Sequence, residues 1–234
     1  MAIVLTNEEV ARGVFMLTAH MPNQARAGQF YMLMPPGGEF SLKRPLSVHD
    51  ATGESLTFLY RVRGRGTKNL SRALPGDSVS MDGPLGTGFF FKDIDSAFVG
   101  GGLGIAPLLF AVKRFKWMYP KRRAVAYLGF SDEAFRCEAF EAISDEVRVQ
   151  VGGSVAEIVG NGVFAYYACG PEPLLRALDK KLGPEADLCV SLESRMGCGV
   201  GACYSCSVKT ALGRQRVCRE GPVFSARAVF YEKA

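Results

Sequence analysis

The spacing of four cysteines near the C-terminus constrains this chain more than any other feature of its sequence. Cys198, Cys203 and Cys206 follow the pattern Cys-x4-Cys-x2-Cys, and Cys218 comes eleven residues later. This is the spacing of plant-type 2Fe-2S clusters. Three glycines within 197–201 favour the tight loop that such a cluster needs, because glycine accepts positive φ. We predict that the four cysteines are the ligands of a 2Fe-2S cluster.

Zinc binding and disulfide formation are the two alternative roles of these cysteines. Zinc sites pair two Cys-x2–4-Cys knuckles, and here Cys218 alone would replace the second knuckle. Disulfides need an oxidising compartment, and the N-terminal residues do not resemble a signal peptide. The sequence also contains no run of eighteen apolar residues that would predict a membrane span. We therefore favour the iron–sulfur interpretation and expect a cytoplasmic protein without a membrane segment.

The positive charge of the chain is concentrated around the cysteine loop. From Ser191 onward there are seven Lys and Arg against three Asp and Glu, so +4 of the net charge of +5 lies there. The basic residues occur singly and without an aromatic stacking set, so no nucleic-acid binding is expected. A face that docks another protein is favoured, since surface charge steers association, and an ordinary solvated face is the alternative.

Residues before about position 93 predict a small antiparallel β-barrel. Short apolar runs separated by Gly, Pro and Asn turns are typical of such barrels. Strands are expected at 13–19, 29–34, 42–50, 55–62 and 77–82. A short helix is expected at 68–73, with a cap near Thr67.

The segment Arg44-Pro45-Leu46-Ser47 lies within one of these expected strands. A guanidinium can bind a pyrophosphate through two hydrogen bonds, and a serine hydroxyl can bond the edge of a flavin ring. Proline fixes φ and keeps the strand extended, so the two polar groups have defined directions. Four residues alone are a weak signal, but they indicate a nucleotide-binding strand.

A second motif begins with Leu59-Tyr60-Arg61 and continues into the turn 64–67, which opens the expected helix. Backbone N–H groups at a helix N-terminus attract anions, so this turn is a candidate phosphate site. The alternative is an ordinary connection between a strand and a helix.

Residues 94–190 change to an alternation of strands and helices, which predicts a doubly wound parallel sheet with ligands at the carboxyl ends of its strands. Strands are expected at 96–99, 123–128, 147–151 and 165–170, and helices at 108–118, 133–142 and 173–182. We expect the helix at 108–118 to be amphipathic.

Two of these expected strands end in residues suited to a dinucleotide. A glycine-rich turn that contains Gly101, Gly102 and Gly104 would let a pyrophosphate approach the backbone, although the G-x-G-x-x-G spacing is absent. Cys169 and Gly170 end another strand, where a thiol could meet a nicotinamide ring; the alternative is a small buried side chain.

Six further titratable residues lie outside these motifs, namely Asp132, Glu133, Cys137, Cys189, His20 and His49. Asp132 and Glu133 follow the second strand of this region, where carboxylates favour a free ribose hydroxyl and therefore NADH over NADPH. Cys137 and Cys189 are expected to be structural, and no role is assigned to His20 or His49.

Taken together, the order of motifs resembles the ferredoxin–NADP reductase superfamily over nearly the whole chain. Residues 193–206 and 216–224 look like those of the electron-transfer subunits of NAD-dependent class 1B dihydroorotate dehydrogenases. The resemblance implies an FAD-binding barrel at 1–93, an NAD-binding α/β domain at 94–190 and a 2Fe-2S module at 191–234. One departure is Leu46, because many reductases of the superfamily have a tyrosine there that stacks on the flavin.

The resemblance also implies cofactor sites and a partner. It assigns nicotinamide positioning to Cys169, and Glu193 is expected near the junction between flavin and cluster. FAD would be held by Arg44, Pro45, Leu46, Ser47, Leu59, Tyr60, Arg61, Gly66 and Thr67, and NADH by Gly101, Gly102, Gly104 and Gly170. The partner would be an FMN-containing dihydroorotate dehydrogenase catalytic subunit in a heterotetramer that serves pyrimidine biosynthesis. Its electrons would pass through 2Fe-2S and FAD to NAD⁺.

Two alternatives stay open at this point. The chain could be the corresponding subunit of a hydrogenase or of a ferredoxin:NADP oxidoreductase. It could also be a non-catalytic zinc- or cluster-binding regulatory module that has kept the fold.

Overall fold

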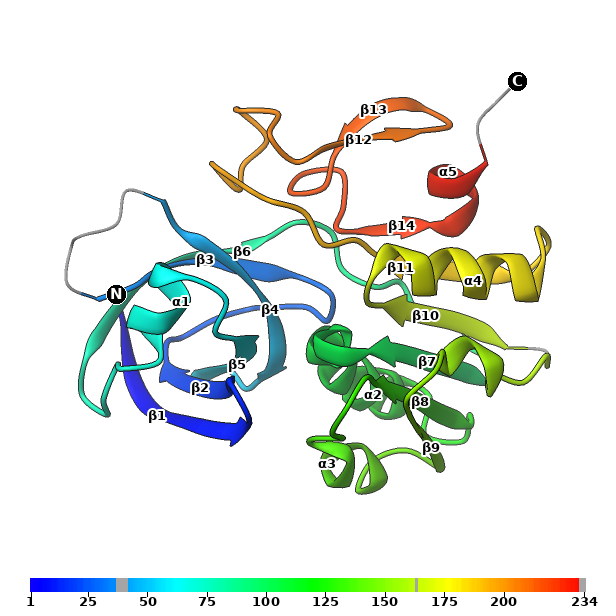
Figure 1. Ribbon diagram of the computed structural model, residues 1–234, viewed down its shortest axis with the longest axis horizontal. Coiled ribbons are helices and arrows are strands. Elements are labelled where there is room, and N and C mark those ends of the chain that lie inside the picture. The colour runs from blue at the N-terminus through cyan, green and yellow to red at the C-terminus, as the bar shows by residue number, and fades with distance from the viewer. Residues whose placement is uncertain (37–41, 163, 232–234) are drawn as a thin grey trace.

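The structure, a computed structural model, describes residues 1–36, 42–162 and 164–231. Its N-terminal part is a closed barrel of six antiparallel strands in the order β1-β2-β5-β4-β3-β6, drawn on the left of Figure 1. The barrel elements are β1 (Ala2–Ala11), β2 (Val14–His20), β3 (Phe30–Met34), β4 (Arg44–Ala51), β5 (Ser55–Arg61), α1 (Arg65–Leu70) and β6 (Ser78–Leu85).

The expected antiparallel barrel and its five expected strands are confirmed. In β2 and β5 the side chains that point inward, such as Leu17 and Phe58, are fully buried, as strand periodicity requires. The sixth strand, β1, was missed because its polar segment Thr6–Glu9 hides the alternation. The expected helix begins three residues earlier than predicted, with Gly64 rather than Thr67 as its N-cap.

The second part of the chain is built on a six-stranded sheet in the order β14-β11-β10-β7-β8-β9. The strands β7 to β11 are parallel, and the order reverses between β7 and β10, as in a doubly wound fold. Its strands are β7 (Ser96–Gly101), β8 (Ala124–Phe130), β9 (Glu146–Val151), β10 (Ala165–Cys169), β11 (Asp187–Ser191) and β14 (Val223–Ser225).

Alternate residues of the central strands enter two different cores, one on each face of this sheet. On one face Phe98 and Tyr167 pack with the barrel and α2, and on the other Val99 and Tyr166 pack near α4. Both faces are therefore covered, which explains why β8 is buried along its whole length. The helices are η1 (Gly102–Ile105), α2 (Ala106–Met118), α3 (Cys137–Glu141), η2 (Val155–Glu157) and α4 (Glu172–Leu182).

Two helix predictions need correction. The first half of α2 is buried on all sides between barrel and sheet, so the helix is not simply amphipathic. The helix expected at 133–142 is shorter, because Phe135 is buried against Phe130 and Arg136 has a φ of 60°. Because of this irregular turn, the helix begins only at Cys137.

The C-terminal segment lies across the top of both parts in Figure 1. It contains a hairpin of β12 (Ser207–Thr210) and β13 (Gly213–Arg216), followed by β14 and α5 (Ala226–Phe230). The strand β14 pairs antiparallel with β11 and so completes the nucleotide-domain sheet, which the sequence did not predict. The boundaries at 93/94 and 190/191 stay predictions.

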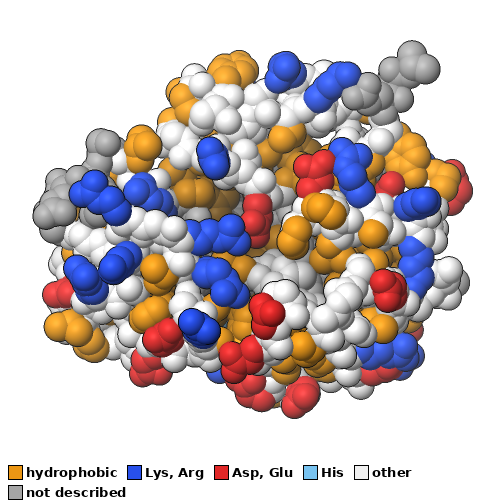
Figure 2. All heavy atoms as spheres, viewed as in Figure 1, with side chains coloured by type: hydrophobic (Ala, Val, Ile, Leu, Met, Phe, Trp, Pro, Cys, Tyr) orange, Lys and Arg blue, Asp and Glu red, His pale blue; other side chains and the backbone are white. Residues whose placement is uncertain are grey.

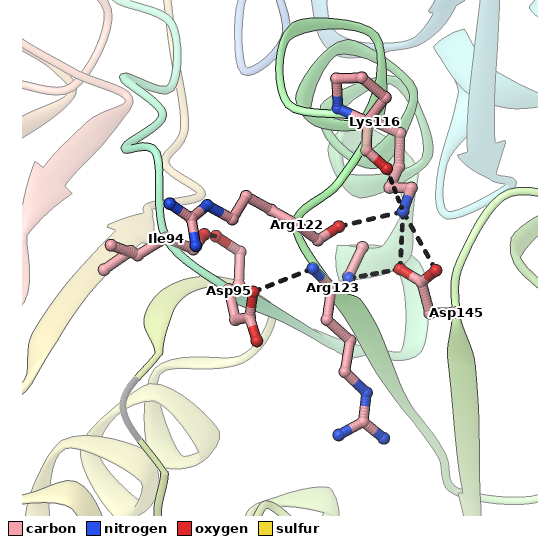
Figure 3. A network of polar contacts seen from close by, with 9 residues as sticks. Ile94, Asp95, Lys116, Arg122, Arg123 and Asp145 are labelled. Atoms are coloured by element: carbon pink, nitrogen blue, oxygen red, sulfur yellow. Dashed lines mark hydrogen bonds and ion pairs between the residues drawn. The ribbon is translucent and has the colours of Figure 1, made fainter.

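A polar network fixes the end of the sheet that lies opposite the carboxyl ends of its strands (Figure 3). Lys116 of α2 donates to the Arg122 carbonyl and forms an ion pair of 2.8 Å with Asp145. Asp145 also accepts from the Ala124 N–H at 2.7 Å, and Asp95 accepts from the Arg123 N–H. Within the described residues, no helix is long and apolar enough to span a membrane.

Candidate functional site

A cleft of about 520 Å³ lies between the barrel, the turn after β7 and the segment 191–196. Figure 2 shows a hollow at this junction, with Lys and Arg side chains along its barrel side. Most of the predicted flavin and nicotinamide residues meet there. Those that line the cleft are Pro45, Leu46, Ser47, Leu59, Tyr60, Arg61, Thr67, Cys169 and Glu193.

Arg44 and Gly66 do not line the cleft, but they contact each other and each precedes a residue that does, Pro45 and Thr67 respectively. A Cβ placed on Gly66 would lie 2.5 Å from Nη2 of Arg44, so only glycine leaves room for the guanidinium at this point. The positively charged guanidinium of Arg44 therefore lies against the first turn of α1. Such a group suits a phosphate, since guanidinium and phosphate form paired hydrogen bonds.

The turn before α1 is already partly satisfied by its own side chain. The Thr67 hydroxyl accepts from the N–H groups of Arg63 and Gly64 and donates to the Gly64 carbonyl. These two N–H groups are therefore not available to bind an anion. The phosphate site that the sequence predicted at this turn loses two of its possible donors. The Tyr60 hydroxyl likewise donates to Asn7 at 3.0 Å, so Tyr60 offers its ring rather than its hydroxyl to the cleft.

The glycine-rich turn after β7 supports the opposite wall. A Cβ on Gly104 would lie 2.2 Å from the Cys169 carbonyl oxygen, so the turn and the end of β10 are in direct backbone contact. Gly101 and Gly102 belong to the same turn but do not line the cleft. Gly170, with a φ of 153°, lines a neighbouring cavity of about 490 Å³ between α4 and the C-terminal segment.

Cys169 is 2% exposed, and burial raises the pKa of its thiol, with the nearby carboxylate of Glu193 adding to the rise. A hydrogen bond with the Ser191 hydroxyl partly opposes this shift. The thiol is therefore neutral at physiological pH. Ser191 was missed because β11 was not identified; its register with β10 places it beside Cys169.

His49 also belongs to this junction, although the sequence gave no signal for it. Its Nδ1 donates to the carbonyl of Ala106 at 2.8 Å, which ties the barrel to the first residue of α2. Burial lowers the pKa of His49 to about 4, so the ring is neutral and the link is an uncharged hydrogen bond.

The four predicted ligand cysteines lie on one loop and the segment after the hairpin. Cys203 is exposed, Cys198 is half-buried, and Cys206 and Cys218 are buried. The loop depends on Gly199, whose φ is 72° and whose Cβ would strike the Met32 side chain at 2.6 Å.

The thiols form two interacting pairs. Cys198 accepts from the N–H groups of Ala202 and Cys203, and the latter, with other backbone donors, lowers the pKa of Cys198. The Ser205 hydroxyl, with backbone donors, lowers the pKa of Cys203 to about 6. Burial, and then the neighbouring Cys206 thiol, raises the pKa of Cys218 to about 12.

The chemistry of these donors suits a two-iron cluster. Two thiol pairs match two irons that each take two thiolates, and the N–H groups aimed at sulfur suit a negatively charged centre. The donor set is therefore compatible with a 2Fe-2S cluster.

Part of the positive charge around this loop is used internally. Arg216 donates to the Gly201 carbonyl, pairs with Glu220 and lies over the Tyr204 ring at 4.8 Å. Arg227 pairs with Glu185. The remaining cationic residues that the structure describes from position 191 onward are all exposed, namely Arg195, Lys209, Arg214 and Arg219.

The closed barrel and the doubly wound sheet together define a fold of the ferredoxin–NADP reductase type. An NADH-dependent reduced ferredoxin-NADP oxidoreductase superposes with a TM-score of 0.88 at 24% identity, covering 99% of this chain and 90% of that one. Phthalate dioxygenase reductase superposes with a TM-score of 0.67 at 16% identity, covering 89% and 85%. At these identities the likeness concerns the fold.

The sequence comparisons specify the family. Residues 193–230 match the iron-sulfur cluster binding domain of dihydroorotate dehydrogenase B. The NAD(+)-dependent dihydroorotate dehydrogenase B electron transfer subunit of Caldanaerobacter subterraneus subsp. tengcongensis is 40% identical, over 98% of both chains. That of Clostridium acetobutylicum is 35% identical, over 94% of this chain and 93% of its own. The chain belongs to the family of dihydroorotate dehydrogenase B electron transfer subunits.

Proposed function

We propose that this chain is the electron transfer subunit of an NAD-dependent dihydroorotate dehydrogenase of pyrimidine biosynthesis. It connects an FMN-containing catalytic partner to NAD(H). One observation carries the proposal: the cleft wall 191–196 runs directly into the loop that begins at Cys198, so nucleotide site and cluster site share one short segment. Bound FAD supplies hydride exchange with nicotinamide, and a 2Fe-2S cluster supplies one-electron exchange.

The barrel wall is proposed to hold FAD. Arg44, cradled by Gly66, balances the pyrophosphate charge, and Ser47 can hydrogen-bond the ring edge. Leu46 contributes apolar contact in place of the stacking tyrosine of many reductases. The other residues proposed to contact FAD are Pro45, Leu59, Tyr60, Arg61 and Thr67, all of which line the cleft.

The opposite wall is proposed to position NAD(H). Gly104 holds the end of β10 close to the turn, so the Cys169 thiol and Gly170 face a nicotinamide from a fixed backbone. Gly101 and Gly102 give the pyrophosphate a close approach, and exposed Asp132 and Glu133 favour a ribose without a 2′-phosphate. Glu193, exposed in the cleft, is proposed to act near the junction between flavin and cluster.

Cys198, Cys203, Cys206 and Cys218 are the proposed cluster ligands. The most exposed of them is Cys203, which lies on the surface with the exposed Val200 and Tyr204. We propose that this surface faces the partner in a heterotetramer. A cytoplasmic location is also proposed, because none of the seven cysteines forms a disulfide and reducing compartments keep thiols reduced.

The test is an absorption spectrum of the protein, purified without oxygen after co-expression with its catalytic partner. Flavin bands and broad iron–sulfur absorption, both bleached by NADH, are expected. Restoration of both on adding orotate, the product that the partner would reduce, identifies the substrate. Orotate without effect would contradict the dihydroorotate assignment and favour another acceptor, and a colourless protein with stoichiometric zinc would contradict the redox function.

Two variants test the residue roles separately. Cys198→Ser is expected to lose the cluster spectrum and keep the flavin spectrum, and a retained cluster spectrum would contradict its assignment as a ligand. Cys169→Ala is expected to slow NADH oxidation while the cluster spectrum stays intact. Cys189→Ala is the matched control, since this half-buried thiol lines neither cavity beside the cleft. Equal NADH kinetics in both alanine variants would contradict the role of Cys169.

A further inference from the structure

An apolar wall separates the cofactor cleft from the two buried cluster cysteines. Cys206 and Cys218 are part of a small hydrophobic core of their own, distinct from the cores of the barrel and the sheet. Three residues belong both to that core and to the lining of the cleft, namely Phe30, Leu192 and Met196. We refer to these three residues as the partition.

The partition is assembled from two distant parts of the chain. Phe30 is the first residue of β3, is 2% exposed and lies opposite Ser47 in the neighbouring strand. Its ring packs closely against Gly86, where a Cβ would lie 2.9 Å from Cε1. Leu192 is held by a hydrogen bond of 2.9 Å from its N–H to the Pro222 carbonyl. Met196 lies two residues before Cys198.

The two sides of the partition differ in polarity. The cleft side carries Ser47, Arg61 and Glu193, which attract water and charged ligand groups. On the other side Cys206 and Cys218 pack with Val217 and Phe224, both buried. Cys218 also lines a separate cavity with Val200 and Arg219 on the outer surface, which the partition does not border. No polar side chain is among the three partition residues, and water enters apolar gaps only where polar partners are present. The buried thiol pair is therefore shielded from water in the cleft.

We propose that the partition keeps water in the cleft away from the inner side of the 2Fe-2S cluster and thereby holds its reduction potential low. Reduction makes a cluster more negative, and water stabilises the added charge, so a dry surrounding disfavours reduction. The outer side, at exposed Cys203, stays accessible to the partner. The inference rests on the proposed function, because it assumes that the four cysteines hold the cluster.

The test replaces partition residues by polar ones and measures the cluster potential by redox titration followed by electron paramagnetic resonance. Met196→Ser is the main variant, since Met196 is only partly buried and a serine is accommodated there. It is expected to raise the ratio of reduced to oxidised cluster about tenfold at a fixed potential, which corresponds to about 59 mV for one electron. The matched control is Met81→Ser in the barrel core, outside both the cleft and the partition. In this control the ratio of reduced to oxidised cluster should change by less than about twofold.

Phe30→Leu and Phe30→Ser provide a second, conservative pair. The leucine variant is expected to keep the wild-type potential, and the serine variant is expected to raise it and to increase deuteron coupling to the cluster in heavy water. An unchanged potential and unchanged deuteron coupling in Met196→Ser would overturn the partition, whatever the folding of Phe30→Ser. A wild-type protein without a cluster would instead overturn the proposed function, so the two failures are distinguishable.

Discussion

Replacing Gly104 by alanine is expected to damage both stability and NADH binding. The new Cβ would lie 2.2 Å from the Cys169 carbonyl oxygen and 2.6 Å from Cα of Gly170. Both obstacles are backbone, so the end of β10 must move away from the glycine-rich turn. Overpacking of this kind costs up to about 3 kcal/mol. For a chain of this size the melting temperature should fall by about 6–12 °C.

Gly102→Ala in the same turn is the matched control. Gly102 has a φ of 54°, but a Cβ there would meet nothing within 4 Å. Its cost is that of a left-handed residue, about 1 kcal/mol, or about 2–4 °C. Thermal unfolding of the purified complex compares the two variants, so Gly102→Ala is a control for stability alone. The KM for NADH is measured in Gly104→Ala, where it should rise about tenfold because the end of β10 has moved. A melting temperature of Gly104→Ala equal to or above that of Gly102→Ala would refute the close backbone contact.

Three further predictions concern other parts of the molecule. Gly66→Ala should displace the Arg44 guanidinium, whose Nη2 lies 2.5 Å from the new Cβ, and weaken FAD binding about tenfold in a fluorescence titration with little change in apoprotein stability. In cluster-free protein, alkylation of Cys203 by iodoacetamide should reach half its maximal rate near pH 6. Ser205→Ala should move that midpoint to higher pH, and an unchanged midpoint would contradict the role of the Ser205 hydroxyl. Asp145→Asn should cost about 1 kcal/mol in denaturant unfolding at pH 7. Burial opposes ionisation of Asp145, but Lys116 and the Ala124 N–H lower its pKa overall. This contribution is therefore present above the unfolded pKa of about 3.9 and is lost as the pH falls through the lower folded pKa. A difference in stability that does not begin to shrink as the pH falls below the unfolded pKa would contradict it.

The arrangement of the cleft suggests why one chain can link two-electron and one-electron chemistry. The cleft wall 191–196 ends at Met196 and the first cluster cysteine follows two residues later, so the two sites are joined by a short covalent segment. The same segment contributes Leu192 and Met196 to the partition, so the connection between the sites is close and apolar. His49 adds a neutral hydrogen bond that holds barrel and nucleotide domain together beside the cleft.

Local patterns in the sequence were sufficient for much of the protein. The cysteine loop was predictable because Cys198, Cys203 and Cys206 are neighbours in the chain, and their spacing alone restricts the metal group that they can share. The same holds for the strand that carries Arg44 to Ser47 and for the glycine-rich turn after β7. In each of these the residues that act together are only a few positions apart, and period and turn chemistry encode their geometry.

Other features depend on contacts between residues that are far apart in the chain. β1 was missed because the polar residues Thr6–Glu9 hide its alternation, and it is recognisable as a strand only through its pairing with β2 and β6. β14 joins the sheet antiparallel to β11, more than thirty residues away in the chain, and no local pattern predicts that pairing. Such pairings are selected by the burial of side chains from both segments, which a single stretch of sequence does not contain.

In the functional site, too, some features follow from the sequence and others only from the tertiary structure. The sequence determined the chemical groups: thiolates at a fixed spacing, a guanidinium in a strand and a thiol at the end of another. Only the tertiary structure decided that Ser191 lies beside Cys169, that Gly66 makes room for Arg44, and that Phe30 separates the cleft from Cys206 and Cys218. Spacing along the chain fixes what is covalently close, whereas the meeting of distant residues is fixed by close packing of the whole core.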